Sequence, residues 1–175
     1  MSKRSLTILS ALSAIAMASI AWAEDPIPES SDNLSVFKQM EEWTIYADAT
    51  RGSCLAERVD AEGNAMQMGL TKDGTAAYVG VFTPADVNFK RSDPIAIAVD
   101  GKIFEGKSHG VRSKKLAGEQ HGGYIITNNP DLVDAIANGS KLIAFPEKVG
   151  VFEVDLTGTK QAIEEIKICT AGLAG

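Results

Sequence analysis

IAIAVDGKIFEG, residues 95–106, carries the strongest hairpin signal in the chain. Two apolar or alternating runs, 95–99 and 102–106, flank the pair Asp100-Gly101. A type I′ turn needs positive φ at both central residues, and Asp-Gly is one of the pairs that adopts it readily. An antiparallel hairpin is therefore predicted here.

The same kind of pattern continues in both directions along the chain. Short apolar or alternating runs recur at intervals of roughly 8 to 12 residues, separated by turn residues, which is typical of sandwiches and barrels. The further strands are predicted at 43–47, 54–59, 65–71, 76–82, 124–127, 142–145 and 151–156. The predicted fold is mainly β: an antiparallel β-sandwich or partly open barrel of about eight or nine short strands.

Two short helices are predicted to interrupt the strands. Asn129 can cap a helix over 130–138, with Pro130 at its first position and Gly139 just past its end. A second helix over 159–170 places Ala162, Ile166 and Cys169 along one apolar stripe. That stripe would be buried and would carry a cysteine.

The N-terminus has the pattern of a secretory signal peptide. Lys3 and Arg4 precede an apolar stretch of about 15 residues, which is shorter than a membrane span, and small residues suit cleavage after Ala23. The predicted organisation is a signal peptide over 1–23, a flexible acidic leader over 24–35 and a single disulfide-tied β domain over 36–175. Export by the general secretion route to the periplasm is expected, with association with the outer membrane as an option.

Cys54 and Cys169 are the two cysteines. In an oxidising compartment such a pair most simply forms a disulfide. A thiol nucleophile or two thiolate ligands are the alternatives, but neither cysteine lies in a CxxC pair or beside a histidine.

Charge is distributed unevenly along the exported part. Without the signal peptide, 15 bases face 23 acids, which argues against a nucleic-acid partner. The stretch 90–115 nevertheless holds seven bases and three acids. It is the predicted contact face for an anionic partner, against the alternative of a solvated rim that protects an edge strand. The candidate residues are Lys90, Arg91, Lys107, Arg112, Lys114 and Lys115.

No metal, cofactor or catalytic site is predicted. His109 and His121 have no recognised ligand spacing, and the bases around them would repel a cation. Met66 and Met68 could bind Cu(I), but their strand period favours core packing. The sequence neighbours Ser108 and His109 do not make a triad, and no paired carboxylates or phosphate-binding loop stand out.

Aromatic residues open the first predicted strand. Trp43 and Tyr46 could anchor a partner at the surface. An aromatic residue at the start of a small β domain more often lies in the core, and this is the favoured interpretation.

Several elements occur in an order that resembles one family of exported proteins. They are Trp43-Thr44-Ile45-Tyr46, Cys54-Leu55-Ala56, the hairpin 99–102, the helix ending at Gly139, and 156–162. Together with the signal peptide, they resemble the invasion-associated locus B family of proteobacteria. The resemblance implies a periplasmic or outer-membrane-associated domain without known catalysis. It departs from the family where members often carry a further cysteine pair, since this chain has Ser108, His109 and Ser113 there.

The predicted function is a non-catalytic, exported binding or maintenance module of the cell envelope, with a role in host interaction as an option. Its partner would be an envelope component or a protein, with peripheral membrane contact and no nucleic acid. An inhibitor or immunity-type protein against a secreted enzyme is the first alternative. A periplasmic metal carrier using Met66, Met68, His109 and His121 is the second.

Overall fold

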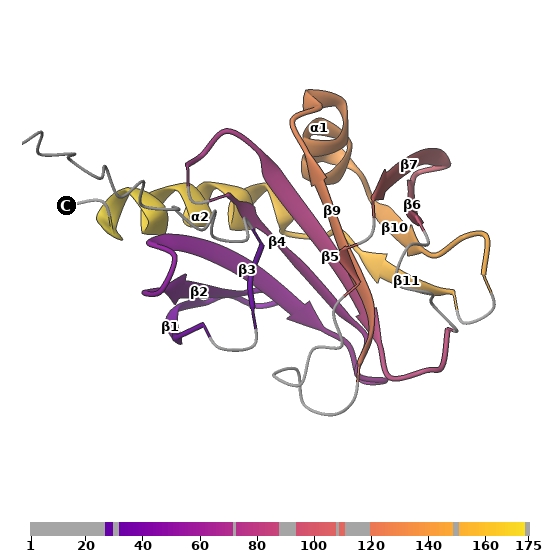
Figure 1. Cartoon of the computed structure of the whole chain (residues 1–175), viewed down its shortest axis with the longest axis horizontal. Helices are drawn as coiled ribbons and strands as arrows, with labels where there is room; N and C mark the ends of the chain where they lie inside the picture. Colours follow the sequence, from indigo (N-terminus) through magenta and orange to yellow (C-terminus); the bar gives the residue numbers. More distant parts are fainter. Residues whose placement is uncertain are drawn as a thin grey trace, which may run out of the picture.

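A computed structural model describes residues 27–29, 32–71, 73–87, 94–107, 109–110, 120–148 and 151–173. Over these residues the chain is mainly β, with antiparallel strands in two sheets and two helices (Figure 1). The predicted fold class, an antiparallel sandwich with two short helices, is confirmed. Neither helix of this part of the chain has the length and apolar content needed to span a membrane.

The larger sheet has seven strands in the order β1-β2-β3-β4-β5-β9-β8. Consecutive hairpins join its first five strands, because polar turns separate the alternating runs. The strands are β1 (Leu34–Gln39), β2 (Thr44–Asp48), β3 (Ser53–Val59), β4 (Ala65–Leu70), β5 (Ala77–Thr83), β8 (His109–Gly110) and β9 (His121–Thr127).

The smaller sheet contains the hairpin that the sequence predicts. Its order is β11-β10-β6-β7, formed by β6 (Pro94–Val99), β7 (Lys102–Lys107), β10 (Lys141–Ala144) and β11 (Phe152–Asp155). Asp100 and Gly101 have φ of 46° and 86°, as a type I′ turn requires. The Asp100 carboxylate also accepts hydrogen bonds from the N–H groups of Ser140 (2.9 Å) and Lys141 (3.1 Å), which ties the hairpin to β10.

Both helices form where the sequence predicts them. Helix α1 (Pro130–Asn138) begins with Asn129 as its cap, whose side chain accepts a hydrogen bond from the Asp131 N–H at 3.0 Å. Helix α2 (Thr159–Leu173) buries Ala162, Ile166 and Cys169 on one stripe. It extends past the predicted end at residue 170.

The two faces of the larger sheet have different environments, which follow from the strand register. The first face packs against α2 and the smaller sheet and forms the main core. Its side chains from the larger sheet are Ile45, Cys54, Ala56, Met66, Met68, Val79, Val81 and Ile125. The second face, on the other side of the same strands, carries Tyr46, Leu55, Glu57, Ala65, Gln67, Tyr78, Phe82 and Tyr124.

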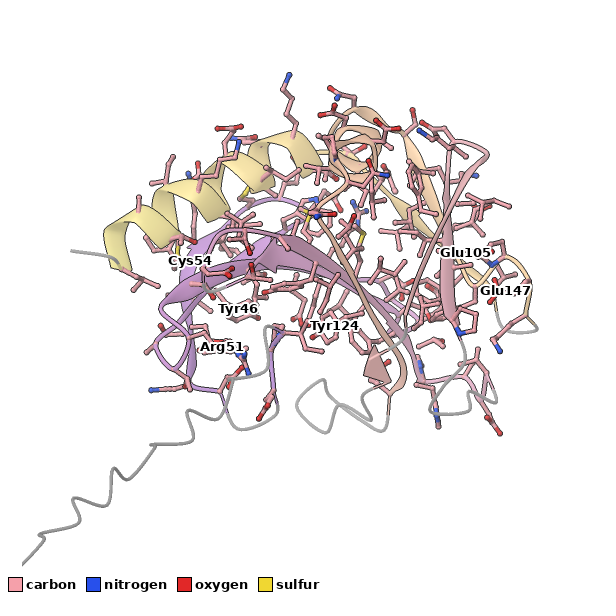
Figure 2. The ribbon with its side chains drawn as sticks, turned by 45° about the horizontal axis from the view of Figure 1, so that its top comes forward. Tyr46, Arg51, Cys54, Glu105, Tyr124 and Glu147 are labelled. Atoms are coloured by element: carbon pink, nitrogen blue, oxygen red, sulfur yellow. A yellow bond between two sulfur atoms is a disulfide. The ribbon has the colours of Figure 1, made fainter. Side chains whose placement is uncertain are left out.

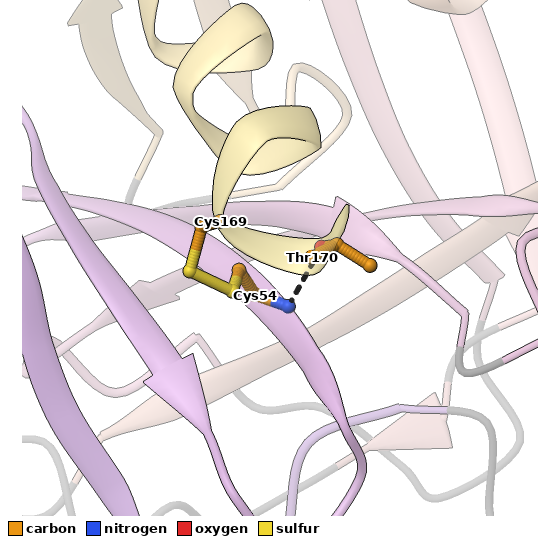
Figure 3. Close-up of a disulfide and its surroundings, with 3 residues drawn as sticks. All are labelled: Cys54, Cys169 and Thr170. Carbon is orange, nitrogen blue, oxygen red and sulfur yellow. Dashed lines mark hydrogen bonds between the residues drawn. A yellow bond between two sulfur atoms is a disulfide. The ribbon is translucent and has the colours of Figure 1, made fainter. Parts of the chain in front are cut away.

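The disulfide lies on the first face. Cys54 of β3 and Cys169 of α2 are bonded, with their Cα atoms 6.0 Å apart, and both are buried (Figure 3). Beside the bond, the Cys54 N–H donates to the Thr170 hydroxyl at 3.1 Å. The predicted pairing is confirmed, and it fixes the C-terminal helix to the sheet across 115 residues of sequence.

The beginning of the domain differs from the prediction. Strand β1 starts at Leu34 rather than after residue 35, and it was not among the predicted strands. Ile27 and Asp32, inside the predicted flexible leader over 24–35, are buried. They are held because Ile27 packs against the second face and Asp32 pairs with a buried arginine.

Candidate functional site

Glycines on the second face make room for aromatic rings. A Cβ at Gly80 would collide with the ring of Tyr124, and a Cβ at Gly69 would collide with the Tyr78 side chain. In the space left free, Tyr124 packs edge-on against Tyr78 and Phe82, with ring centroids 5.6 and 5.1 Å apart. The second face thus has a layer of rings lying over bare backbone.

The residues just before β1 close one side of this face. Arg51, in the turn between β2 and β3, places its Nε 2.6 Å from the Asp32 carboxylate and 3.7 Å from that of Asp48. All three side chains are buried. A backbone hydrogen bond adds to this contact, because the Asn33 N–H donates to the Thr50 hydroxyl at 2.9 Å. This segment is therefore fixed to the turn by a buried ion pair.

The two aspartates differ in proton affinity because they share one arginine. Although burial opposes it, hydrogen bonds from the Arg51 side chain and the Glu29 N–H lower the pKa of Asp32. Burial raises the pKa of Asp48, and the negative charge of Asp32 adds to that increase. Arg51 is thus the cation that allows at least one carboxylate to stay ionised in the interior.

A pocket of about 500 Å³ lies between this segment and the second face. We call it the second-face pocket. Its size is within the range of roughly 300–1,000 Å³ that is typical of small-molecule sites. It is lined by Asp32, Asn33, Leu34, Tyr46, Glu57, Val59, Gly63, Ala65, Gln67 and Gln120. Figure 2 shows Tyr46, Arg51 and Tyr124 on the side of the sheet away from α2.

A chain of hydrogen bonds crosses the sheet at the base of the pocket. Glu57, Gln67, Gly80 and Tyr124 are directly opposite one another on β3, β4, β5 and β9. Because Gly80 has no side chain, the Tyr124 hydroxyl reaches over it and donates to Gln67 Oε1. Gln67 Nε2 in turn donates to Glu57 Oε2 at 2.5 Å. The buried amide of Gln67 is thereby satisfied at both ends and holds the Glu57 carboxyl in place.

Burial in the pocket changes the pKa values of Glu57 and Tyr46. Burial raises the pKa of Glu57, although the hydrogen bond from Gln67 acts against the increase. Burial also raises the pKa of Tyr46, with a contribution from the negative charge of Glu57. Tyr46 therefore remains a neutral phenol that can donate a hydrogen bond, and Glu57 is a carboxyl group whose ionised form lacks solvation.

Gln120 adds an unsatisfied acceptor to the pocket lining. Its amide nitrogen donates to the Gly63 carbonyl at 2.8 Å, which fixes the orientation of the amide. Its Oε1 is buried and accepts no hydrogen bond from the residues that the structure describes. The residue as a whole is 3% exposed, and a buried polar atom of this kind normally has a hydrogen-bond partner.

The predicted basic contact face falls mostly outside the described residues. Lys90, Arg91, Arg112, Lys114 and Lys115 are not among those residues, and only the backbone of Lys107 is, at the end of β7. The strands that flank these segments in the sequence are described, together with their pairing. Thr83 pairs with His121 and Gly110 pairs with Gly123, so Thr83, Gly110 and His121 lie at one end of the larger sheet.

The other sequence candidates have clear positions. Met66 and Met68 are buried on the first face, so their predicted core role is confirmed. Trp43 is also in the core, and its indole N–H donates to the Thr157 carbonyl at 3.0 Å. Tyr46 is half-buried and belongs to the second-face pocket, which differs from the predicted core position.

Only one of the two histidines has a described side chain. His121 is half-buried on β9, and the side chain of His109 is not described. Within the described ranges, no three His, Cys, Asp or Glu side chains gather in a way that could hold a metal ion.

Sequence reasoning missed Glu57, Gln67 and Gln120. A signal for two of them was present, because Glu57 and Gln67 interrupt predicted strands at the positions facing away from Cys54, Met66 and Met68. Polar residues at the period of one face indicate a wet or functional surface. Gln120 carries no such signal.

The chain matches no family model, no curated protein sequence and no solved structure.

Proposed function

We propose that this protein is an exported, non-catalytic binding domain that holds its ligand in the second-face pocket. The single observation that carries the proposal is the pocket itself, about 500 Å³ in volume, with polar side chains fixed at its base. A rigid scaffold with a few oriented polar groups is the usual form of a small-molecule site.

Export is supported by the covalent structure and by the sequence. A buried disulfide that closes 115 residues is typical of oxidising compartments, to which the signal-like N-terminus would direct the chain. The resemblance to the invasion-associated locus B family agrees with a place in the bacterial envelope. Under this proposal the pocket serves an envelope function outside the cytoplasm.

Site-specific photo-crosslinking in envelopes tests the proposal. Val59 lines the pocket and is 53% exposed, so a benzoylphenylalanine there is expected to capture the bound species. Ile168 on α2 is 59% exposed and lies far from the pocket in the fold, which makes it the matched control. Capture at Val59 alone supports the proposal, and equal capture at both positions or none at Val59 overturns it.

A secreted hydrolase captured in stoichiometric amount would replace the envelope role with that of an inhibitor. The identity of the captured species therefore separates the two roles at the same site.

The basic residues are a second proposed contact, for an anionic envelope component. Arg112, Lys114 and Lys115 precede Gln120, which lines the pocket, by eight, six and five positions in the sequence. Reversing these three charges is expected to weaken association with envelope fractions and its dependence on salt. Unchanged association and salt dependence would remove this contact from the proposal.

A further inference from the structure

We propose that the second-face pocket selects an organic cation, of the guanidinium or ammonium type, through Glu57 and Gln120. This inference rests on the proposed binding function and adds the chemical class of the ligand.

The first step is the charge of the pocket lining. Among the described residues that line the pocket there are two carboxylates, Asp32 and Glu57, and no lysine, arginine or histidine. Arg51 compensates Asp32 from behind, with its Nε 2.6 Å from the Asp32 carboxylate. Glu57 accepts a hydrogen bond from Gln67, and no described cation pairs with it. In its ionised form, Glu57 is thus a negative charge at the base of the pocket that no described cation compensates.

The second step is the direction of the open hydrogen bonds. Gln67 is engaged at both ends of its amide, with its oxygen accepting from Tyr124 and its nitrogen donating to Glu57. Gln120 has its nitrogen engaged by Gly63 and its oxygen unpaired. Glu57 Oε1 and Gln120 Oε1 are both acceptors, so a ligand that completes them must bring N–H or O–H donors.

The third step is the energetic cost of these two acceptors in the folded protein. A poorly solvated carboxylate and a buried, unsatisfied amide oxygen are both unfavourable in the folded protein. A guanidinium or ammonium group supplies charge and several donors at once, which a neutral hydroxyl does not. The preference for a cation over a neutral ligand of the same shape follows.

The experiment compares two probes of equal shape by isothermal titration calorimetry, using oxidised protein recovered from the periplasm. N-acetylarginine amide carries a guanidinium group, and N-acetylcitrulline amide replaces it with a neutral urea. The charged probe is expected to bind about tenfold or more tightly than the neutral one. Equal affinity for the two probes, or binding of neither, overturns the inference.

Two variants locate the effect. Glu57→Gln removes the charge but keeps an oxygen for Gln67, and it is expected to lose about tenfold or more in affinity for N-acetylarginine amide. Glu105→Gln removes the same charge from an exposed position on β7 and is expected to bind as the wild type does. Equal losses in the two variants would contradict a local role of Glu57.

A pH series on the wild-type protein gives a readout that needs no variant. The titratable groups near Glu57 are the phenols of Tyr46 and Tyr124 and the carboxyl group of Asp32. Arg51 and Asp48 lie behind Asp32. The raised pKa values of both phenols keep them neutral, and the guanidinium keeps its charge, so affinity should fall on acidification as Glu57 gains a proton. An affinity that does not change as the pH is lowered through the titration of Glu57 would contradict the inference.

Maltose serves as a neutral polyol probe and separates the two proposals. Binding of maltose without binding of N-acetylarginine amide overturns the cation inference while the binding function stands. Failure of crosslinking at Val59 overturns the binding function itself.

Discussion

The two faces of the larger sheet use the same strands for opposite purposes. On the first face, apolar side chains interlock with α2 and the smaller sheet, and a disulfide joins Cys54 to Cys169. On the second face, glycines and rings leave a polar pocket whose hydrogen-bond chain ends at Glu57. Because side chains alternate along a strand, one run of residues can build a stable core and a binding site back to back. The first face accounts for stability, and under our proposal the second face serves recognition.

Removing the disulfide should have the largest effect and should leave the pocket chemistry untouched. The double variant Cys54→Ala with Cys169→Ala is expected to lose about 4–5 kcal/mol of unfolding free energy, because the unfolded chain gains the freedom of a long loop. Urea denaturation measures the loss, and adding a reductant to the double variant should change nothing further. A loss below about 1 kcal/mol would contradict a structural role for the first-face bond.

Arg51→Met should have the next largest effect. It leaves Asp32 and Asp48 buried without their cation, which typically costs about 3–5 kcal/mol. The loss should shrink on acidification, since protonation removes the unpaired charges. Lys102→Met is the control, because the exposed pair of Lys102 with Asp131 is worth about 0–1 kcal/mol. Similar losses in urea denaturation of the two variants would refute the role of the buried ion pair.

Gly80→Ala tests whether the bare backbone of the second face is required. The added methyl group displaces the Tyr124 ring, so we expect a loss of about 1–3 kcal/mol in urea denaturation together with weaker binding in the pocket. Gly172→Ala in α2 meets no atom within 4 Å and should be neutral or stabilising by up to about 1 kcal/mol. Wild-type stability in Gly80→Ala would mean that the ring can move freely.

Glu57→Gln should have the smallest effect on stability, and it should stabilise the protein where the other variants destabilise it. Since burial raises the pKa of Glu57, the folded protein disfavours the ionised carboxyl, and the wild type loses stability as the pH rises through the Glu57 titration. The variant should therefore have the higher melting temperature at neutral pH and the same melting temperature as wild type at acidic pH. A lower melting temperature for the variant at neutral pH would show that the carboxylate stabilises the fold.

Sequence reasoning succeeded where local chemistry decides the structure. Asp100-Gly101 specifies its own turn, Asn129 and Pro130 specify a helix start, and two cysteines allow one internal pairing. Strand β1 was not predicted because most of its residues are exposed, at the edge of the sheet where β2 is its neighbouring strand. Its polar edge position gives no clear alternation to recognise.

The pocket could not be predicted because it depends on register. Gly80 and Tyr124 are 44 positions apart in sequence, and only the pairing of β5 with β9 places the ring over the glycine. Gln120 acquires its role from the carbonyl of Gly63, in a hairpin loop on the other side of β5. The polar residues in β3 and β4 were visible in the sequence, but the space in front of them was not.

The most direct test of the division between the faces is an NMR titration of the oxidised protein with N-acetylarginine amide. The side-chain amide signals of Gln67 and Gln120 should shift as the probe binds, while the methyl signals of Met66 and Met68 on the first face stay in place. Shifts of the methionine methyl groups without shifts of the two glutamine amides would contradict the assignment of recognition to the second face.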